Sequence, residues 1–172
     1  MLKDGALLSQ NWEQFETVFA AKVWGAWNLH QALQNYHQPI DFFVLFSSIA
    51  SLLGSPGQSN YAAANAFLDG LAHYRHQFGL PATSINWGPW AEVGMAAELT
   101  AKHQSKGIVA LQPAQGLSAF GLVLKHTQNQ ILIANINKTE LVKTYGKLPA
   151  LLSEWNKYLV APVSVAKTKL PN

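Results

Sequence analysis

Strand-length apolar runs alternate with helical stretches through most of this 172-residue chain, and that alternation constrains its fold more than any other feature. Apolar runs occupy residues 41–47, 83–87 and 130–136. Apolar spacings of three and four, with turn residues at the ends, predict helices over 11–34, 58–78 and 114–126. Strands joined by such helices lie parallel in one sheet, with right-handed crossovers. The sequence therefore predicts an α/β fold, a parallel sheet of about three strands with flanking helices.

The segments between and after these elements indicate where the domain ends. Residues 91–108 have weak periodicity, which predicts a long loop or lid that contacts a substrate. Residues 137–155 show helical apolar spacing, whereas 156–172 hold two prolines and no large apolar cluster. We therefore expect one domain over 1–155 and a linker over 156–172.

The composition excludes several classes of function. Only 12% of the residues are charged, against roughly 25% in typical domains, which fits a piece of a larger assembly. Eleven lysines and Arg75 are spread thinly, so a nucleic-acid surface is not indicated. The chain has no cysteine, no metal-ligand spacing among its histidines, no signal peptide and no apolar run near the ~20 residues of a membrane helix. We expect a cytoplasmic protein with no metal and no membrane or nucleic-acid partner.

Residues suited to proton transfer follow the first apolar run. Ser48 lies at its carboxyl end, where open parallel sheets place their ligand crevice. Tyr61 and Asn65 are four residues apart on the next predicted helix and so share one face. Taken singly, a helical tyrosine is most often a packing residue and a serine there a strand end or cap. Together, these residues suit proton delivery to a carbonyl oxygen.

The segment 46–65, FSSIASLLGSPGQSNYAAAN, resembles the catalytic loop of short-chain dehydrogenase/reductases. It resembles more closely the ketoreductase domain of modular polyketide synthases. The wider superfamily carries a lysine four residues after the tyrosine, where this chain has Asn65. In polyketide and fatty-acid synthase ketoreductases these two residues exchange positions, and Lys22 stands where the lysine of that pattern is expected, on the preceding helix. The resemblance runs from about residue 4 to residue 155, and it implies the C-terminal part of a Rossmann-like doubly wound parallel sheet.

The resemblance implies a catalytic set of four residues. Tyr61 would be the general acid; a phenol in water ionises only near pH ~10, so it needs help near neutrality. Lys22 would favour the phenolate through its positive charge, although most helical lysines are simply solvated. Ser48 would hydrogen-bond the substrate carbonyl, and Asn65 would complete the polar network through an ordered water.

The resemblance also implies contacts to NADPH. Tyr61 and Lys22 would bind this cofactor together with Gly88 and Pro89, and exposed backbone at Gly88 would bond the carboxamide of the nicotinamide. The alternative for this segment is a strand-ending turn followed by buried aromatic residues.

A further group of residues would contact the substrate and control stereochemistry. Trp90 and Met95 belong to the segment that opens the substrate lid in the family. Asp4, Pro56 and Asn60 match the B-type ketoreductases, which give the D-configured 3-hydroxy product. Lys3 replaces the first aspartate of the B-type signature, so the match is partial.

The usual glycine-rich dinucleotide turn is not found in this sequence. We therefore expect the C-terminal, catalytic half of a ketoreductase, partnered by the N-terminal half, an acyl carrier protein and other domains of a synthase module. It would reduce a 3-oxoacyl thioester on the carrier protein. The alternatives are a catalytically silent structural subdomain, a fragment without independent activity, and a free-standing dehydrogenase of small alcohols. Asn65 and the trailing linker disfavour the last of these.

Overall fold

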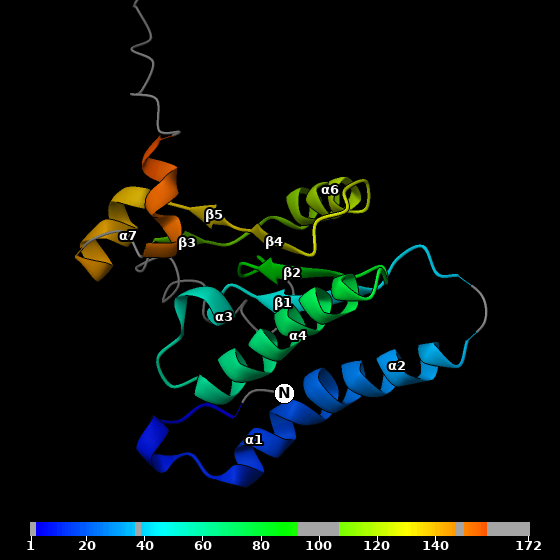
Figure 1. Cartoon of the computed structure of the whole chain (residues 1–172). Coiled ribbons are helices and arrows are strands. Elements are labelled where there is room, and N and C mark those ends of the chain that lie inside the picture. The colour runs from blue at the N-terminus through cyan, green and yellow to red at the C-terminus, as the bar shows by residue number, and fades with distance from the viewer. Residues whose placement is uncertain (1–2, 37–38, 93–106, 147–149, 158–172) are drawn as a thin grey trace, which may run out of the picture.

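A computed structural model describes residues 3–36, 39–92, 107–146 and 150–157 of the chain. Its central feature is a sheet of three parallel strands, β1 (Val44–Ser48), β2 (Thr83–Trp87) and β4 (Gln130–Ile133), in the order β1-β2-β4 (Figure 1). Ser48 is level with Trp87, so β1 and β2 end together. The predicted α/β fold with a three-stranded parallel sheet is confirmed.

Helices cover both faces of this sheet (Figure 1). On one face lie α4 (Ser59–Gln77) and a long helix made of α1 (Trp12–Phe19), η2 (Ala20–Trp24) and α2 (Gly25–Gln34). On the other face lies α6 (Pro113–Val123). The short helices η1 (Leu7–Ser9) and α3 (Ala50–Leu53) precede α1 and follow β1, respectively.

The helix ends follow from local sequence. Asn11 caps α1, because its side-chain oxygen accepts the Gln14 N–H at 3.0 Å while the Gln14 side chain accepts the Asn11 N–H at 2.9 Å. Pro113 occupies the first turn of α6, where its missing N–H leaves no hydrogen bond unmade.

The helix predicted over 11–34 contains a π-helical turn, η2, which the periodicity did not predict. The Gly25 N–H bonds the Ala20 carbonyl, five residues back, so the turn holds one extra residue. The buried residues Val18 and Val23 are accordingly five apart instead of three or four. Single π-helical turns of this kind often lie at functional sites, and Lys22 belongs to this one.

The strand predicted over 130–136 is two strands. β4 ends at Ile133, and β5 (Asn135–Ile136) pairs antiparallel with β3 (Ile108–Val109) in a separate small sheet. Two helices, α7 (Lys138–Tyr145) and η4 (Ala150–Lys157), follow. The predicted domain end at 155 falls inside η4, and most of the predicted linker lies outside the described residues.

Apolar packing on both sheet faces and beneath the small sheet holds the fold together. One cluster lies between the sheet and α4: Phe43, Leu45, Leu68, Leu71, Ala72 and Ala82. A second, on the α6 side, comprises Ile85, Trp87, Leu111 and Val123, and a third, near β3 and β5, comprises Ile49, Ile108, Leu141 and Leu152. Full burial of one such aliphatic side chain contributes about 1.5–3 kcal/mol.

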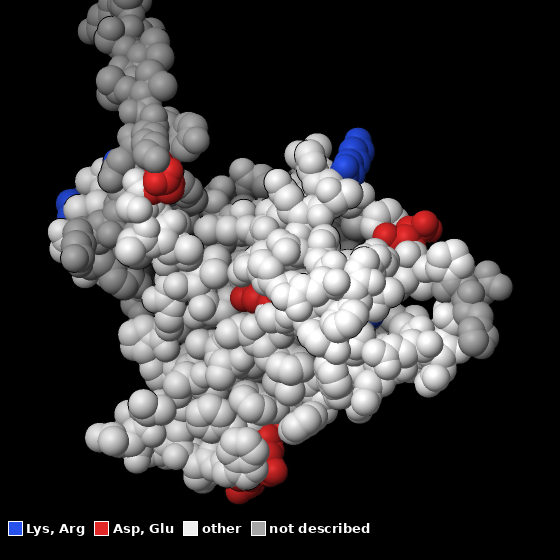
Figure 2. Space-filling view, in the orientation of Figure 1, with Lys and Arg blue, Asp and Glu red and all other residues white. Residues whose placement is uncertain are grey.

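The surface carries few charges. Figure 2 shows one face on which uncharged side chains predominate, with isolated acidic and basic groups. No helix among the described residues has the length and apolarity needed to cross a membrane. Within the same residues, no group of three or more His, Cys, Asp or Glu side chains could hold a metal ion.

Candidate active site

The candidate site lies where β1 and β2 end. Ser48 is the last residue of β1; α3 and a loop then lead to α4, which begins two residues before Tyr61. The loop turns through Gly54 and Gly57, whose φ values of 72° and 81° fall in the left-handed region that favours glycine. Ser48 therefore lies at the carboxyl edge of the sheet, where the sequence placed it.

Lys22 and Tyr61 come together across two helices. The Lys22 Nζ lies 5.6 Å from the centroid of the Tyr61 ring. It also donates a hydrogen bond of 2.7 Å to the Phe46 carbonyl oxygen, at the edge of β1. Burial lowers the pKa of Lys22, and the negative charge of Asp69 partly opposes that shift. The geometry therefore places a half-buried cationic group beside a phenol.

Asn65 is fully buried one turn beyond Tyr61. Its side-chain Nδ2 donates to the Tyr61 backbone carbonyl at 2.7 Å, and its backbone carbonyl accepts from the Ser47 hydroxyl at 3.1 Å. Its Oδ1 is buried and has no partner among the described residues. A buried acceptor of this kind costs free energy unless a water or a ligand group donates to it.

The Ser48 hydroxyl lies at the turn into α3. Its oxygen accepts the Ala50 N–H at 3.2 Å, which leaves the hydroxyl proton for donation to a substrate carbonyl. The Ser48 carbonyl accepts from the Ser51 hydroxyl at 2.8 Å and from Asn86 Nδ2 at 3.4 Å. The strand end that carries Ser48 is therefore fixed from two neighbouring elements.

A buried carboxylate supports this region and was not predicted from the sequence. Asp69 on α4 accepts hydrogen bonds from Ser51 and from Ser84 and Asn86 of β2. A signal for it was present: Ser84 and Asn86 are polar residues in a strand expected to be covered on both faces, and such residues need a partner.

The N-terminal segment packs against the loop before Tyr61. The Asp4 carboxylate accepts from Gln58 Nε2 at 3.1 and 3.2 Å, and the Gly5 N–H bonds the Gly57 carbonyl at 2.8 Å. Pro56 is exposed in the same loop. The structure therefore brings Asp4 and Pro56 into one region, although they are 52 positions apart in the sequence.

Asn60 joins the same region from within the core. It is fully buried, and its Nδ2 donates to the Lys3 carbonyl at 2.9 Å and to the Gln14 carbonyl at 3.2 Å. Its Oδ1 accepts the Tyr61 N–H at 2.7 Å. These bonds engage both ends of the side-chain amide, so Asn60 holds the N-terminal segment in place.

The predicted exposure of the Gly88 backbone is wrong, whereas the contact of Gly88 and Pro89 with NADPH stays a prediction. Both residues are buried, and the Gly88 N–H bonds the Ile133 carbonyl at 2.8 Å, which continues the parallel ladder beyond β2. A contact from Gly88 to a ligand would therefore have to come from its carbonyl oxygen.

Trp90 packs inward. Its ring contacts that of Trp87 with the centroids 5.0 Å apart, and it covers Gly116 of α6 so closely that a Cβ there would lie 2.7 Å from two ring carbons. Trp90 is half-buried, and its contact with a substrate stays a prediction. Met95, the other residue predicted to contact substrate here, lies outside the described residues.

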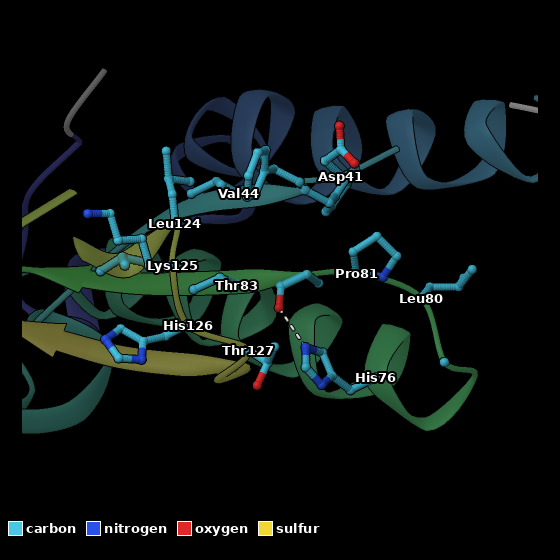
Figure 3. A pocket seen from close by; sticks show the side chains of 15 residues that line it. Asp41, Val44, His76, Leu80, Pro81, Thr83, Leu124, Lys125, His126 and Thr127 are labelled. Carbon is cyan, nitrogen blue, oxygen red and sulfur yellow. Dashed lines mark hydrogen bonds between the residues drawn. The ribbon is translucent and has the colours of Figure 1, made fainter. Parts of the chain in front are cut away.

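A cavity of about 400 Å³ lies at the opposite end of the sheet (Figure 3). Asp41, Thr83 and Thr127 line it, at or before the starts of the three strands, together with His76, whose Nε2 bonds the Ala82 carbonyl at 2.7 Å. Open parallel sheets bind ligands at the carboxyl ends of their strands. This cavity is therefore separate from the candidate active site.

Comparison with known proteins finds polyketide synthases among the relatives of this chain. The KR domain family matches residues 1–92. A mycocerosic acid synthase-like polyketide synthase of Mycolicibacterium smegmatis is 43% identical over 129 residues, which is 73% of this chain and 6% of the relative. Polyketide synthase GfsB of Streptomyces halstedii is 40% identical over 148 residues, which is 85% of this chain and 3% of the relative. The chain thus spans a small part of these large proteins.

Solved structures give the same result. A-type ketoreductases from a modular polyketide synthase match with a TM-score of 0.82 and 35% identity, over 88% of this chain and 32% of theirs. The first ketoreductase of the tylosin polyketide synthase matches with a TM-score of 0.77 and 33% identity, over 93% of this chain and 36% of that structure.

Proposed function

Because this chain belongs to the KR (ketoreductase) domain family of modular polyketide synthases, we propose that it carries the catalytic groups for the NADPH-dependent reduction of a 3-oxoacyl thioester. The reacting ketone would be held by an acyl carrier protein and reduced to the D-3-hydroxyacyl thioester. We further propose that the dinucleotide-binding half of the domain, the carrier protein and other domains of a synthase module are its partners. We call the ketoreductase domain formed by this chain and that dinucleotide-binding half the complete domain.

The observation that carries the proposal is the meeting of Lys22 and Tyr61 at the carboxyl edge of the sheet. These residues are 39 positions apart in the sequence, yet the Lys22 Nζ lies 5.6 Å from the tyrosine ring. Lys22 is also oriented by its bond to the Phe46 carbonyl. A cation held in this way favours proton release from the phenol, which a general acid requires.

The residues present fit a reduced nicotinamide cofactor. Tyr61 and Lys22 offer a hydroxyl and an ammonium group suited to ribose hydroxyls, and the Asn65 Oδ1 acceptor is unpaired among the described residues. The cofactor would supply the hydride. Tyr61 would donate the proton to the carbonyl oxygen, and the Ser48 hydroxyl would stabilise the negative charge that develops there.

The configuration of the product is proposed from the residues beside the catalytic loop. Asp4 contacts Gln58, and Pro56 lies in the same exposed loop. Asn60 holds the segment next to Asp4 through its bond to the Lys3 carbonyl. We assign Asp4 and Pro56 to the surface that selects the side from which the acyl chain enters, and their resemblance to the B-type pattern predicts the D-configured product.

The test is Tyr61→Phe in the complete domain, with Tyr74→Phe as a matched control. Tyr74 lies on the same helix, is 39% exposed and packs among the rings of Trp27, His30 and Phe78. Tyr61→Phe is expected to lower kcat about a hundredfold or more, because general acid catalysis contributes about 10²–10⁴-fold, while NADPH binding is retained. Tyr74→Phe is expected to keep the original kcat.

NADPH oxidation with a 3-oxoacyl thioester measures the rate, and chiral analysis of the hydroxy product measures its configuration. Original turnover in Tyr61→Phe would refute the catalytic assignment. A complete domain that binds NADPH but reduces no thioester would support a structural role instead, and a mainly L-configured product would refute the stereochemical proposal alone.

A further inference from the structure

Asp69 lies on the same face of α4 as Tyr61 and Asn65. The three residues are spaced by four along the helix, and successive residues at that spacing lie one above another. Asp69 is only 8% exposed, and within the described residues no lysine or arginine forms an ion pair with it. A buried carboxylate without an ion-pair partner is costly unless hydrogen bonds satisfy its oxygens.

The carboxylate of Asp69 is held by three side chains. Oδ1 accepts from the Ser84 hydroxyl at 2.5 Å and from Asn86 Nδ2 at 3.0 Å. Oδ2 accepts from Asn86 Nδ2 at 2.9 Å and lies 2.7 Å from the Ser51 hydroxyl, whose single proton it shares with the Ser48 carbonyl. These donors belong to α3 and β2, so Asp69 ties both elements to α4.

Two short chains of hydrogen bonds connect this carboxylate to predicted catalytic residues. Ser51 lies between Asp69 and the Ser48 carbonyl, at 2.7 and 2.8 Å. Asn86 lies 3.1 Å from the Ser47 hydroxyl, which donates to the Asn65 carbonyl. The Asp69 carboxylate thus fixes both the strand end that carries Ser48 and the helix turn that carries Asn65.

Resting on the function proposed above, we propose that Asp69 is a positioning residue for ketone reduction, which holds Ser48 and Asn65 in place through Ser51, Asn86 and Ser47. It makes no contact with the substrate. Its carboxylate bonds Ser51 of α3 and Asn86 of β2, and these two side chains in turn bond Ser48 and Ser47 of β1.

The charge of Asp69 has a second effect, on Lys22. Burial lowers the pKa of Lys22, and the negative charge of Asp69 raises it, which favours the cationic form. Among the described residues, the ionisable groups that interact with Lys22 are Tyr61 and Asp69, both on α4, and β1 contributes the Phe46 carbonyl. Removal of the Asp69 charge is therefore expected to let Lys22 lose its proton at a lower pH.

The experiment compares Asp69→Asn with Leu71→Ala and Tyr61→Phe in the complete domain. Leu71 is a buried core residue on the same helix that belongs to the cluster with Phe43 and Leu45, so its truncation lowers stability without touching the hydrogen-bond network. Thermal unfolding, kcat, KM for the thioester and the pH dependence of kcat are measured for each variant.

Asp69→Asn is expected to lower kcat about tenfold to a hundredfold, the size of effect that a small misplacement of catalytic groups produces, with KM changed less than about threefold. Its alkaline limb in the pH profile of kcat should move to lower pH. Leu71→Ala should lose thermal stability but keep kcat and the alkaline limb. If Asp69→Asn does not fold, Ser51→Ala, which keeps the Asp69 carboxylate and removes the hydroxyl between it and the Ser48 carbonyl, should still lower kcat.

Two results would overturn the proposal. One is a folded Asp69→Asn with kcat within about threefold of the original and an unmoved alkaline limb. The other is a Ser51→Ala with full activity when Asp69→Asn is unfolded. Either result alongside an inactive Tyr61→Phe would leave the proposed function intact, whereas an active Tyr61→Phe would refute the function itself.

Discussion

The packing of Trp90 on α6 gives a stability prediction that a matched pair of glycines can test. Gly116 is buried under the Trp90 ring, and a Cβ at this position would lie 2.7 Å from each of two ring carbons. Carbon atoms pack favourably at about 3.5–4.0 Å, so the ring would have to retreat by about 1 Å or more. Gly121 lies on the same helix and is exposed, and a Cβ there would meet nothing within 4 Å.

The magnitude follows from two opposing contributions. Replacing a helical glycine by alanine gains about 0.5–1 kcal/mol at either position. Forcing an extra group into a packed core costs about 1–3 kcal/mol, and this cost applies only to Gly116. Gly121→Ala should therefore stabilise the complete domain, and Gly116→Ala should be about 1–3 kcal/mol less stable than Gly121→Ala.

Urea unfolding of the two variants measures this difference directly, and tryptophan fluorescence reports the environment of the displaced ring. Equal stabilities of the two variants, to within about 0.3–0.5 kcal/mol, would refute the close packing of Trp90 on Gly116. In that case Trp90 would be free to turn toward a substrate, as the family resemblance implies.

Three further predictions concern the rest of the fold. Burial and the neighbouring Arg75 lower the pKa of His30, so the unfolded chain binds the proton more readily. The free energy of unfolding should therefore fall as the pH drops below about 6.5. The urea midpoint should fall less between pH 7.5 and pH 5.5 in His30→Gln than in the original protein, and an equal fall would contradict this. Gly107→Ala should destabilise by at least about 1–3 kcal/mol, because φ there is +78° and a Cβ would lie 2.7 Å from the Asn137 carbonyl oxygen; an unchanged thermal midpoint would count against it. Asn60→Ala should release the N-terminal segment, seen as faster amide hydrogen exchange at Gly5, and unchanged exchange would argue against the role of Asn60.

Much of the architecture could be predicted because strong local signals coincide with it. The apolar runs became the three parallel strands, and the predicted helix over 58–78 matches α4 to within one residue at each end. The strand over 130–136 was too long, because β4 leaves the parallel sheet at Ala134 and the chain pairs with β3 instead. That pairing partner is distant in the sequence and leaves no local pattern.

The candidate site was predictable in its residue types but not in its supporting contacts. Sequence spacing placed Tyr61 and Asn65 on one face of a helix. The position of Lys22 near Tyr61 was predicted only from the family pattern, and the π-helical turn that contains Lys22 was not predicted. The five-residue interval between Val18 and Val23 was the available signal for that turn. Asp69 was missed because a single acidic residue on a helix is usually solvated, and only its polar neighbours in β2 reveal its burial.

The extra residue in η2 also determines how this helix can change. It puts α1 and α2 out of phase by about 100° relative to an uninterrupted α-helix. This offset lets Val18 pack with Ala64 of α4, while Trp27 and Leu33 pack in the cluster that contains Phe43 and Leu45. An insertion or deletion of one residue within 12–34 would rotate either Val18 or the pair Trp27 and Leu33 away from these packing partners and toward water. Segments recombined between related ketoreductases should therefore be joined outside this helix, with its length kept.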